Sequence, residues 1–272
     1  TWADHQLKKR PDVVRAIHQD YVAAGADVIS TNTFQLTRRS ITSHFKDDEH
    51  MRRIGAADVA TRWGDLLRAG VALATEACVG AGRPVAVAGA MTTLEWCFRP
   101  DLAPSEAEAT AEYLETISVF AEAGADLLLL ETVNSTSEAV AAARAAQSAG
   151  IPLWVAFVPD ENGKLFTGET MADAERALAG YDPDVVLLNC APPADVTAGL
   201  RELAPHRRGA KGVYPHVGRF FPPEWLFTDE YPPDRYLDVA RDWADLGAQV
   251  LGGCCGTTPE HIALLRSELR TG

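Results

Sequence analysis

Hydrophobic residues along this chain alternate between helical spacing and short continuous runs. A helical pattern begins at Pro11 and ends at Gly25, and an apolar run over residues 27–32 follows. The same order of helix, glycine and apolar run returns at 123–131 and at 246–252. Runs that are apolar at every position are typical of strands buried on both faces, as in parallel sheets. The pattern therefore predicts an α/β fold.

The pattern continues along the whole chain without a linker or a low-complexity segment. It predicts seven strands, at residues 27–32, 85–91, 127–131, 153–158, 185–190, 212–214 and 250–251. It predicts helices at residues 11–24, 47–79, 105–123, 137–149, 171–179, 194–203, 235–246 and 259–269, with Ser105 and Glu108 forming a capping box. A closed (β/α)8 barrel needs about eight such strands. We therefore expect a single domain of the TIM-barrel type with one strand missing.

Polar and reactive side chains gather just past the predicted strand ends. They are Thr31, Asn32, Glu131, Thr132, Asn189, Cys190, Tyr214, His216, Cys254 and Cys255. Barrel enzymes carry their active sites at the carboxyl ends of the strands. Two long connections at the same end, residues 92–104 and 215–233, contain the aromatic residues Trp96, Phe98, Phe220, Phe221 and Trp225. We expect these loops to be lids or walls of a pocket.

The composition argues against two classes of partner, nucleic acids and membranes. The net charge of −13 argues against binding nucleic-acid phosphates, and no apolar run approaches the length of a membrane span. Five cysteines, an odd number, indicate a reducing compartment. We predict a cytoplasmic protein that acts on small molecules, with no nucleic-acid or membrane partner, as a monomer or as an oligomer.

Three of the five cysteines suit a metal ion. Cys190 ends one predicted strand, and Cys254 with Cys255 ends another, in a Gly-Gly-Cys-Cys-Gly turn before a helix. Three thiolates suit zinc and leave its fourth position for water or substrate, which is the catalytic arrangement. Neighbouring thiols could also form a strained vicinal disulfide, which we consider the weaker reading. Cys78 and Cys97 are interpreted as small buried hydrophobic residues.

These motifs resemble the zinc-dependent homocysteine S-methyltransferases, a family that includes betaine–homocysteine methyltransferase. The resemblance rests on Asn189-Cys190, on the Gly-Gly-Cys-Cys-Gly-Thr turn at 252–257, on residues 25–34 and on Leu130-Glu131-Thr132. It implies a (β/α)8 barrel in which Cys190, Cys254 and Cys255 bind Zn²⁺. It also implies that Glu131 holds the homocysteine ammonium group and that Thr31 and Asn32 line the same pocket. From the residues alone, the alternative for Glu131 is a helix-terminus or ion-pair residue, and Thr31 and Asn32 could equally be turn-formers.

The chain departs from the family pattern at two places. Family members begin with a strand that ends in an Asp-Gly-Gly or Asp-Gly-Ala turn, and this sequence starts beyond that point. We therefore expect residues 1–272 to form a homocysteine-binding barrel that is N-terminally incomplete relative to the family. The second departure is Tyr214-Pro215-His216, where the family commonly has Tyr-Pro-Asn.

The resemblance predicts a methyltransferase that moves a methyl group from an onium-type donor to homocysteine, giving methionine. S-methylmethionine, S-adenosylmethionine and betaine are donors of this type. Aromatic walls attract cations, so Trp96 and Phe98 together with His216 are candidates for the donor pocket. Two alternatives are the same zinc chemistry on another thiol or selenol, and a non-catalytic zinc-binding relative.

Overall fold

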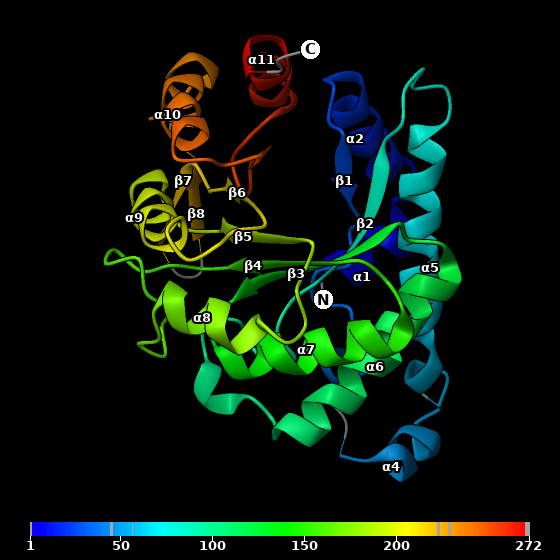
Figure 1. Cartoon of the computed structure of the whole chain (residues 1–272). Helices are drawn as coiled ribbons and strands as arrows, with labels where there is room; N and C mark the ends of the chain where they lie inside the picture. Colours follow the sequence, from blue (N-terminus) through cyan, green and yellow to red (C-terminus); the bar gives the residue numbers. More distant parts are fainter. Residues whose placement is uncertain (1, 44–45, 56, 222–223, 228–229, 270–272) are drawn as a thin grey trace.

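The computed structural model describes residues 2–43, 46–55, 57–221, 224–227 and 230–269. Its centre is a sheet of seven parallel strands, in the order β1-β2-β3-β4-β5-β6-β9 (Figure 1). The strands are β1 (Val28–Ser30), β2 (Ala86–Met91), β3 (Leu127–Val133), β4 (Leu153–Phe157), β5 (Val185–Asn189), β6 (Ala210–Tyr214) and β9 (Val250–Leu251). All seven predicted strands are therefore confirmed, together with the α/β class.

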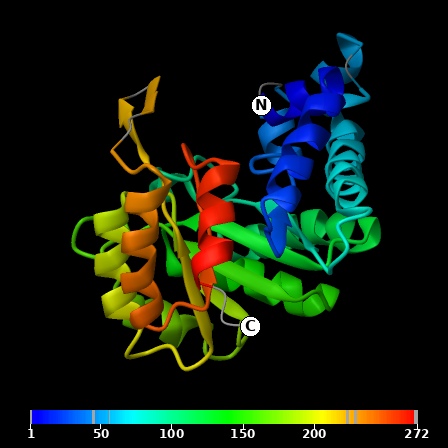
Figure 2. The ribbon, with the colours of Figure 1, turned by 90° about the horizontal axis from the view of Figure 1, so that it is seen from above.

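The sheet has the strand order of a TIM-type barrel but is open. In the described part of the chain, β1 and β9 are its two edges, and they do not pair with each other. The helices bridge the opening: α11 (Pro259–Leu269, red) contacts α2 (Pro11–Ala23, blue), as Figure 2 shows from above. Arg266 of α11 forms an ion pair with Asp27 at 2.6 Å, and the hydroxyl of Tyr21 donates to the carbonyl of Thr257 at 2.9 Å. That the chain lacks a first strand stays a prediction.

The other helices follow the predicted alternation with three differences. They are α1 (Trp2–Lys9), α3 (Arg38–Thr42), α4 (Asp48–Arg53), α5 (Val59–Cys78), α6 (Glu106–Ala123), α7 (Thr136–Ala149), α8 (Met171–Leu178), α9 (Pro193–Leu203) and α10 (Pro233–Asp245). The short helices α1 and α3 were not predicted. The predicted helix 47–79 is wrong as one element, because the chain turns at Gly55, whose φ of 75° is left-handed. The loop 215–233 contains a hairpin of β7 (Gly218–Phe221) and β8 (Glu224–Phe227).

The capping box predicted for α6 is present. The hydroxyl of Ser105 accepts a hydrogen bond from the backbone N–H of Glu108, whose carboxylate accepts one from the N–H of Ser105. These bonds satisfy backbone donors that the first helical turn leaves free. The sequence signature therefore set the start of this helix.

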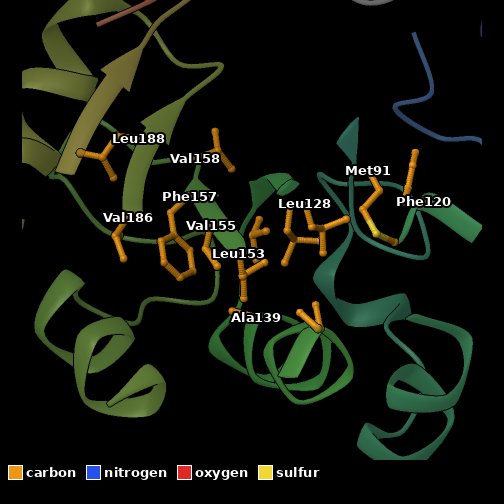
Figure 3. Close-up of a cluster of buried hydrophobic side chains, with 14 of the residues drawn as sticks. Met91, Phe120, Leu128, Ala139, Leu153, Val155, Phe157, Val158, Val186 and Leu188 are labelled. Carbon is orange, nitrogen blue, oxygen red and sulfur yellow. The ribbon is translucent and has the colours of Figure 1, made fainter. Parts of the chain in front are cut away.

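Strand residues alternate between two hydrophobic clusters. Leu128 and Leu130 pack with Val155, Phe157 and helix residues such as Phe120 and Ala139 (Figure 3). Leu127 and Leu129 pack with Ala88, Ala156 and Leu187 from other strands. The first cluster joins the sheet to its helices, and the second fills the inner side of the curved sheet. Because both faces are buried, the strands are apolar at every position.

Among the described residues, none of the helices combines the length and the apolar character needed to cross a bilayer.

Candidate metal centre

Three cysteines meet at the carboxyl end of the sheet. Cys190 follows β5, and Cys254 and Cys255 follow β9. Their Sγ atoms all lie within 4.8 Å of one another, and those of Cys254 and Cys255 are 3.8 Å apart. A tetrahedral zinc ion with Zn–S bonds of about 2.3 Å separates its sulfur ligands by about 3.8 Å. The donor set and its spacing therefore fit zinc, and all three residues are partly exposed.

This cluster is the only group of three or more His, Cys, Asp or Glu ligand atoms so arranged in the part of the chain that the structure describes. Cys78 and Cys97 lie outside it. Burial raises the pKa of the Cys97 thiol to about 12, as expected for an inert buried cysteine.

Backbone hydrogen bonds hold the cysteine loops against each other. The N–H of Cys254 donates to the carbonyl of Pro215 at 2.9 Å, and the N–H of Val217 donates to the carbonyl of Cys255 at 2.9 Å. The hydroxyl of Thr257 then donates to the carbonyl of Cys254 at 2.7 Å. A Cβ atom at Gly253 would lie 2.3 Å from the Thr257 side chain, so only glycine fits there. The glycine in the motif is thus explained by close packing.

The thiols share their protons unequally. Hydrogen bonds from Cys190 and then Cys254 lower the pKa of Cys255 to about 3. The hydrogen bond with Cys190 is the main reason why the pKa of Cys254 is raised well above its ordinary value. A bound cation would favour the thiolate form of all three cysteines.

Glu131 lies in β3 at the same end of the sheet. Burial raises the pKa of its carboxyl group to about 7, while the hydroxyl of Tyr214, which donates to it at 3.1 Å, opposes this rise. Tyr214 comes from the end of β6. This role of Tyr214 could not be predicted from the sequence, because its contact with Glu131 joins residues that are far apart in the chain.

Asn189, which precedes Cys190, pairs with Thr132, which follows Glu131. Asn189 and Thr132 have exposed fractions of 0% and 1%. The Oδ1 atom of Asn189 accepts a hydrogen bond from the N–H of Thr132, and its Nδ2 donates to the hydroxyl of Thr132, both at 3.0 Å. Both positions could be placed at strand ends from the sequence, but their contact could not be predicted.

Thr31 and Asn32, the other residues assigned to the substrate pocket, follow β1. The hydroxyl of Thr31 is buried, lies 2.6 Å from that of Thr33, and accepts a hydrogen bond from the N–H of Ala90 at 3.0 Å. This contact ties β1 to β2. Asn32 is partly exposed.

The aromatic residues of the predicted donor pocket lie on exposed loops. Trp96 and Phe98 have ring centroids 6.2 Å apart, and Phe98 lies 5.8 Å from Phe166, which the sequence analysis missed. Phe166 is in the loop between β4 and α8, so two loops supply one aromatic cluster. The side chains of Phe220, Phe221 and Trp225 lie outside the described residues.

His216, which was predicted for the donor pocket together with Trp96 and Phe98, lies beside the cysteines, and its role in that pocket stays a prediction. Its backbone N–H donates to the carbonyl of Ala191 at 3.1 Å, and its side chain is buried. Burial lowers the pKa of its imidazole. When protonated, it favours the thiolate form of Cys255. Its position therefore suits a neighbour of the metal centre.

Known proteins of similar sequence include a methionine synthase and a homocysteine S-methyltransferase. The chain is 32% identical over 270 residues to methionine synthase of Mycobacterium tuberculosis, covering 93% of this chain and 21% of that protein. It is 27% identical to homocysteine S-methyltransferase 1 of Arabidopsis thaliana, covering 99% of this chain and 86% of the relative. The chain thus spans about a fifth of the first relative and most of the second.

Solved structures of the homocysteine methyltransferase MmuM from Escherichia coli have the same fold. The oxidized form superposes with a TM-score of 0.80 at 26% identity, covering 98% of this chain and 87% of MmuM. The metallated form superposes with a TM-score of 0.78 at 26% identity, covering 98% and 88%. A protein of this fold and similar sequence therefore binds a metal.

The family model described as homocysteine S-methyltransferase matches residues 1–269, nearly the whole chain. The resemblance inferred from the double-cysteine turn and the Asn-Cys motif is confirmed. The chain belongs to the homocysteine S-methyltransferase family.

Proposed function

We propose that this protein transfers a methyl group from an onium-type donor to the thiol of homocysteine, giving methionine, at a zinc ion held by Cys190, Cys254 and Cys255. The observation that carries the proposal is the convergence of the three sulfur atoms within 4.8 Å, at the end of the sheet where Glu131 lies. Family membership supports the methyl transfer.

Zinc supplies one piece of chemistry when bound: its charge lowers the pKa of a substrate thiol, so that the thiol reacts as a thiolate at neutral pH. The sulfur of homocysteine attacks the methyl carbon, the new S–C bond forms, and the bond from that carbon to the onium atom breaks. The electron pair stays on the leaving atom, and the thiol proton goes to solvent. A sulfonium or a quaternary ammonium is a suitable donor because its onium atom becomes neutral.

Glu131 is the proposed partner of the homocysteine ammonium group. A carboxylate in a poorly hydrated position gains strongly from a cation. The ammonium group would favour ionisation of Glu131, and the Tyr214 hydroxyl keeps one of its oxygens oriented. The carboxylate thus offers its other oxygen to the substrate.

The aromatic cluster of Trp96, Phe98 and Phe166 is the proposed contact of the onium donor. Faces of aromatic rings attract cations, most strongly at tryptophan. Trp96 and Phe98 are 52% and 38% exposed, and Phe166 is 47% exposed, so their rings are accessible. Thr31 and Asn32 remain proposed contacts of homocysteine, with the backbone-tying role of the Thr31 hydroxyl as the alternative.

The proposal is tested by zinc content, zinc-edge X-ray absorption and methyl transfer in the same preparations. Wild-type protein should show three sulfur ligands, and a fourth when homocysteine is added. Cys190→Ala and Cys254→Ala should lose zinc and methyl transfer together, and Cys78→Ala, the matched control, should keep both.

Three results would contradict this proposal. Full zinc occupancy in Cys190→Ala would exclude the three-thiolate site. A sulfur count that homocysteine leaves unchanged, with no methionine formed, would favour a non-catalytic zinc protein. Faster methylation of another thiol or a selenol would keep the metal site but replace the acceptor.

A further inference from the structure

We propose that Asn189 and Thr132 form a positioning pair that holds the Glu131 carboxylate at a set distance from the Cys190 thiol, so that the site selects thiols that carry an ammonium group. This inference rests on the proposed function. Neither residue needs to touch the substrate, because Thr132 directly follows Glu131 and Asn189 directly precedes Cys190.

The pair is built as a two-point contact in a closed environment. The carboxamide of Asn189 uses its oxygen for the N–H of Thr132 and its nitrogen for the hydroxyl of Thr132. Both bonds are 3.0 Å long, and both residues are buried. A two-point contact fixes orientation as well as distance, and in a buried site it has no competition from water.

The hydrogen bonds of the sheet alone do not fix the position of Glu131 relative to Cys190. Glu131 lies in β3 and Cys190 follows β5, and β4 separates these strands. The register between β3 and β4 is also irregular between Leu130 and Val133, next to Glu131. The Asn189–Thr132 pair crosses β4 at this irregular point, where ladder hydrogen bonds do not determine the position of Glu131.

A second contact closes a ring around the same residues. The hydroxyl of Tyr214 donates to Glu131 at 3.1 Å, and the carbonyl of Tyr214 accepts a hydrogen bond from the N–H of Cys190 at 3.4 Å. The ring passes from Glu131 to Thr132, Asn189, Cys190 and Tyr214 and returns to Glu131. Two independent connections therefore join the carboxylate to the thiol.

The backbone at both ends of the pair is strained. Thr132 has φ of 60° and Cys190 has φ of 51°, and in the described chain Asp182 is the only other non-glycine residue with positive φ. Left-handed φ is unfavourable for a β-branched residue such as threonine. Strained residues persist where the surroundings over-determine them, commonly at functional sites. Here the positive φ angles lie at Thr132, which follows Glu131, and at Cys190, which follows Asn189.

The test compares homocysteine with its analogue that lacks the amino group, a mercaptobutanoate. Zinc-loaded protein is used, and binding of each thiol is measured by titration alongside methyl transfer. Asn189→Ala should retain zinc at one ion per chain but lose at least about tenfold of its preference for homocysteine, with the main effect on KM. Thr132→Ala should lose part of this preference, and Thr132→Ser, which keeps the hydroxyl, should retain it.

Thr197→Val is the matched control. The hydroxyl of Thr197 accepts a hydrogen bond from the indole of Trp243 at 2.7 Å and donates to the carbonyl of Pro193 at 2.7 Å, between α9 and α10. Its loss should lower stability without changing the preference between the two thiols. A double variant with Glu131→Ala adds a second check, because Asn189→Ala should have little further effect once the carboxylate is absent.

The positioning role would be overturned if Asn189→Ala weakened the binding of homocysteine and of the mercaptobutanoate equally. It would also be overturned if Thr197→Val reduced the preference for homocysteine as much as Asn189→Ala. Full additivity of Asn189→Ala and Glu131→Ala would do the same. The binding titration separates this inference from the proposed function. Wild-type protein that binds homocysteine selectively but forms no methionine would contradict only the proposed function, whereas absence of selective binding would contradict the positioning pair itself.

Discussion

Glu131 shows how burial and function compete at a single residue. Its carboxyl group lies at the end of a strand made of leucines, and burial raises its pKa from 4.5 to about 7. The hydroxyl of Tyr214 offsets part of this cost by donating to the carboxylate. Because ionisation of this carboxyl group is costly, a cation such as the proposed ammonium group of the substrate would favour its charged form.

This environment predicts a pH-dependent stability of the metal-free protein. Because the folded state binds the Glu131 proton more tightly than the unfolded state, the free energy of unfolding should fall as pH rises from 4.5 to about 7 and then level off. The full loss is on the order of 3 kcal/mol. Glu131→Gln cannot ionise, so it should match wild type at about pH 5 and be more stable at about pH 8. Urea unfolding at both pH values measures this free energy. The same change between the two pH values in wild type and in Glu131→Gln would contradict the prediction.

At the scale of elements, the loop after β2 is anchored on two sides. The carboxylate of Glu138 in α7 accepts hydrogen bonds from the N–H of Leu94 and from the hydroxyl of Tyr113, both at 3.0 Å. On the other side, Arg39 of α3 forms ion pairs with Glu95 of the loop and Glu112 of α6. Of the two roles expected for this loop, a fixed wall is therefore favoured over a mobile lid.

Removing the Glu138 anchor should release this loop. Glu138→Ala leaves the N–H of Leu94 and the buried hydroxyl of Tyr113 without their partner, which should cost about 2–5 kcal/mol of stability. Protease cleavage near Trp96 should become faster, as measured by limited proteolysis with mass spectrometry. Tyr113→Phe, which removes only one of the two bonds, should have the smaller effect. Unchanged cleavage in Glu138→Ala would show that the Arg39 ion pairs suffice.

At the scale of the whole molecule, two of the three cysteines of the candidate metal centre depend on a short edge strand. β9 pairs with β6 through only Gly212 with Val250 and Val213 with Leu251. A Cβ atom at Gly212 would lie 2.1 Å from the carbonyl oxygen of Val250. Cys254 and Cys255 follow β9 directly, so the close approach at Gly212 places two of the three thiols.

Gly212→Ala should therefore lower zinc affinity as well as stability. The methyl group must push β9 away from β6, which moves Cys254 and Cys255 relative to Cys190. Gly89→Ala is the matched control, because its Cβ would meet the ring of Phe120 at 2.7 Å on the helix side of the sheet. We expect both variants to lose stability and only Gly212→Ala to lose at least about tenfold in zinc affinity, measured by competition with a chelator. Equal zinc affinity in the two variants would contradict this dependence.

The order of the seven strands in the sheet and the clustering of three cysteines could be predicted from the sequence. Buried parallel strands and amphipathic helices have different hydrophobic periods, and strand ends in one parallel sheet share an edge. Cys190, Cys254 and Cys255 could therefore be placed together before the structure was known. The capping box at Ser105 was predictable for a similar reason, since it depends only on residues within one helical turn.

Only the tertiary structure decided the contacts between distant residues. The pairing of Asn189 with Thr132, the hydrogen bond from Tyr214 to Glu131 and the approach of Phe166 to Phe98 have no local signature, because each joins separate strands or loops. The position of His216 beside the cysteines likewise follows from backbone bonds between neighbouring loops. Local pattern thus determined which elements form and which chemistry they carry, whereas side-chain packing across the sheet determined how the reactive groups face one another.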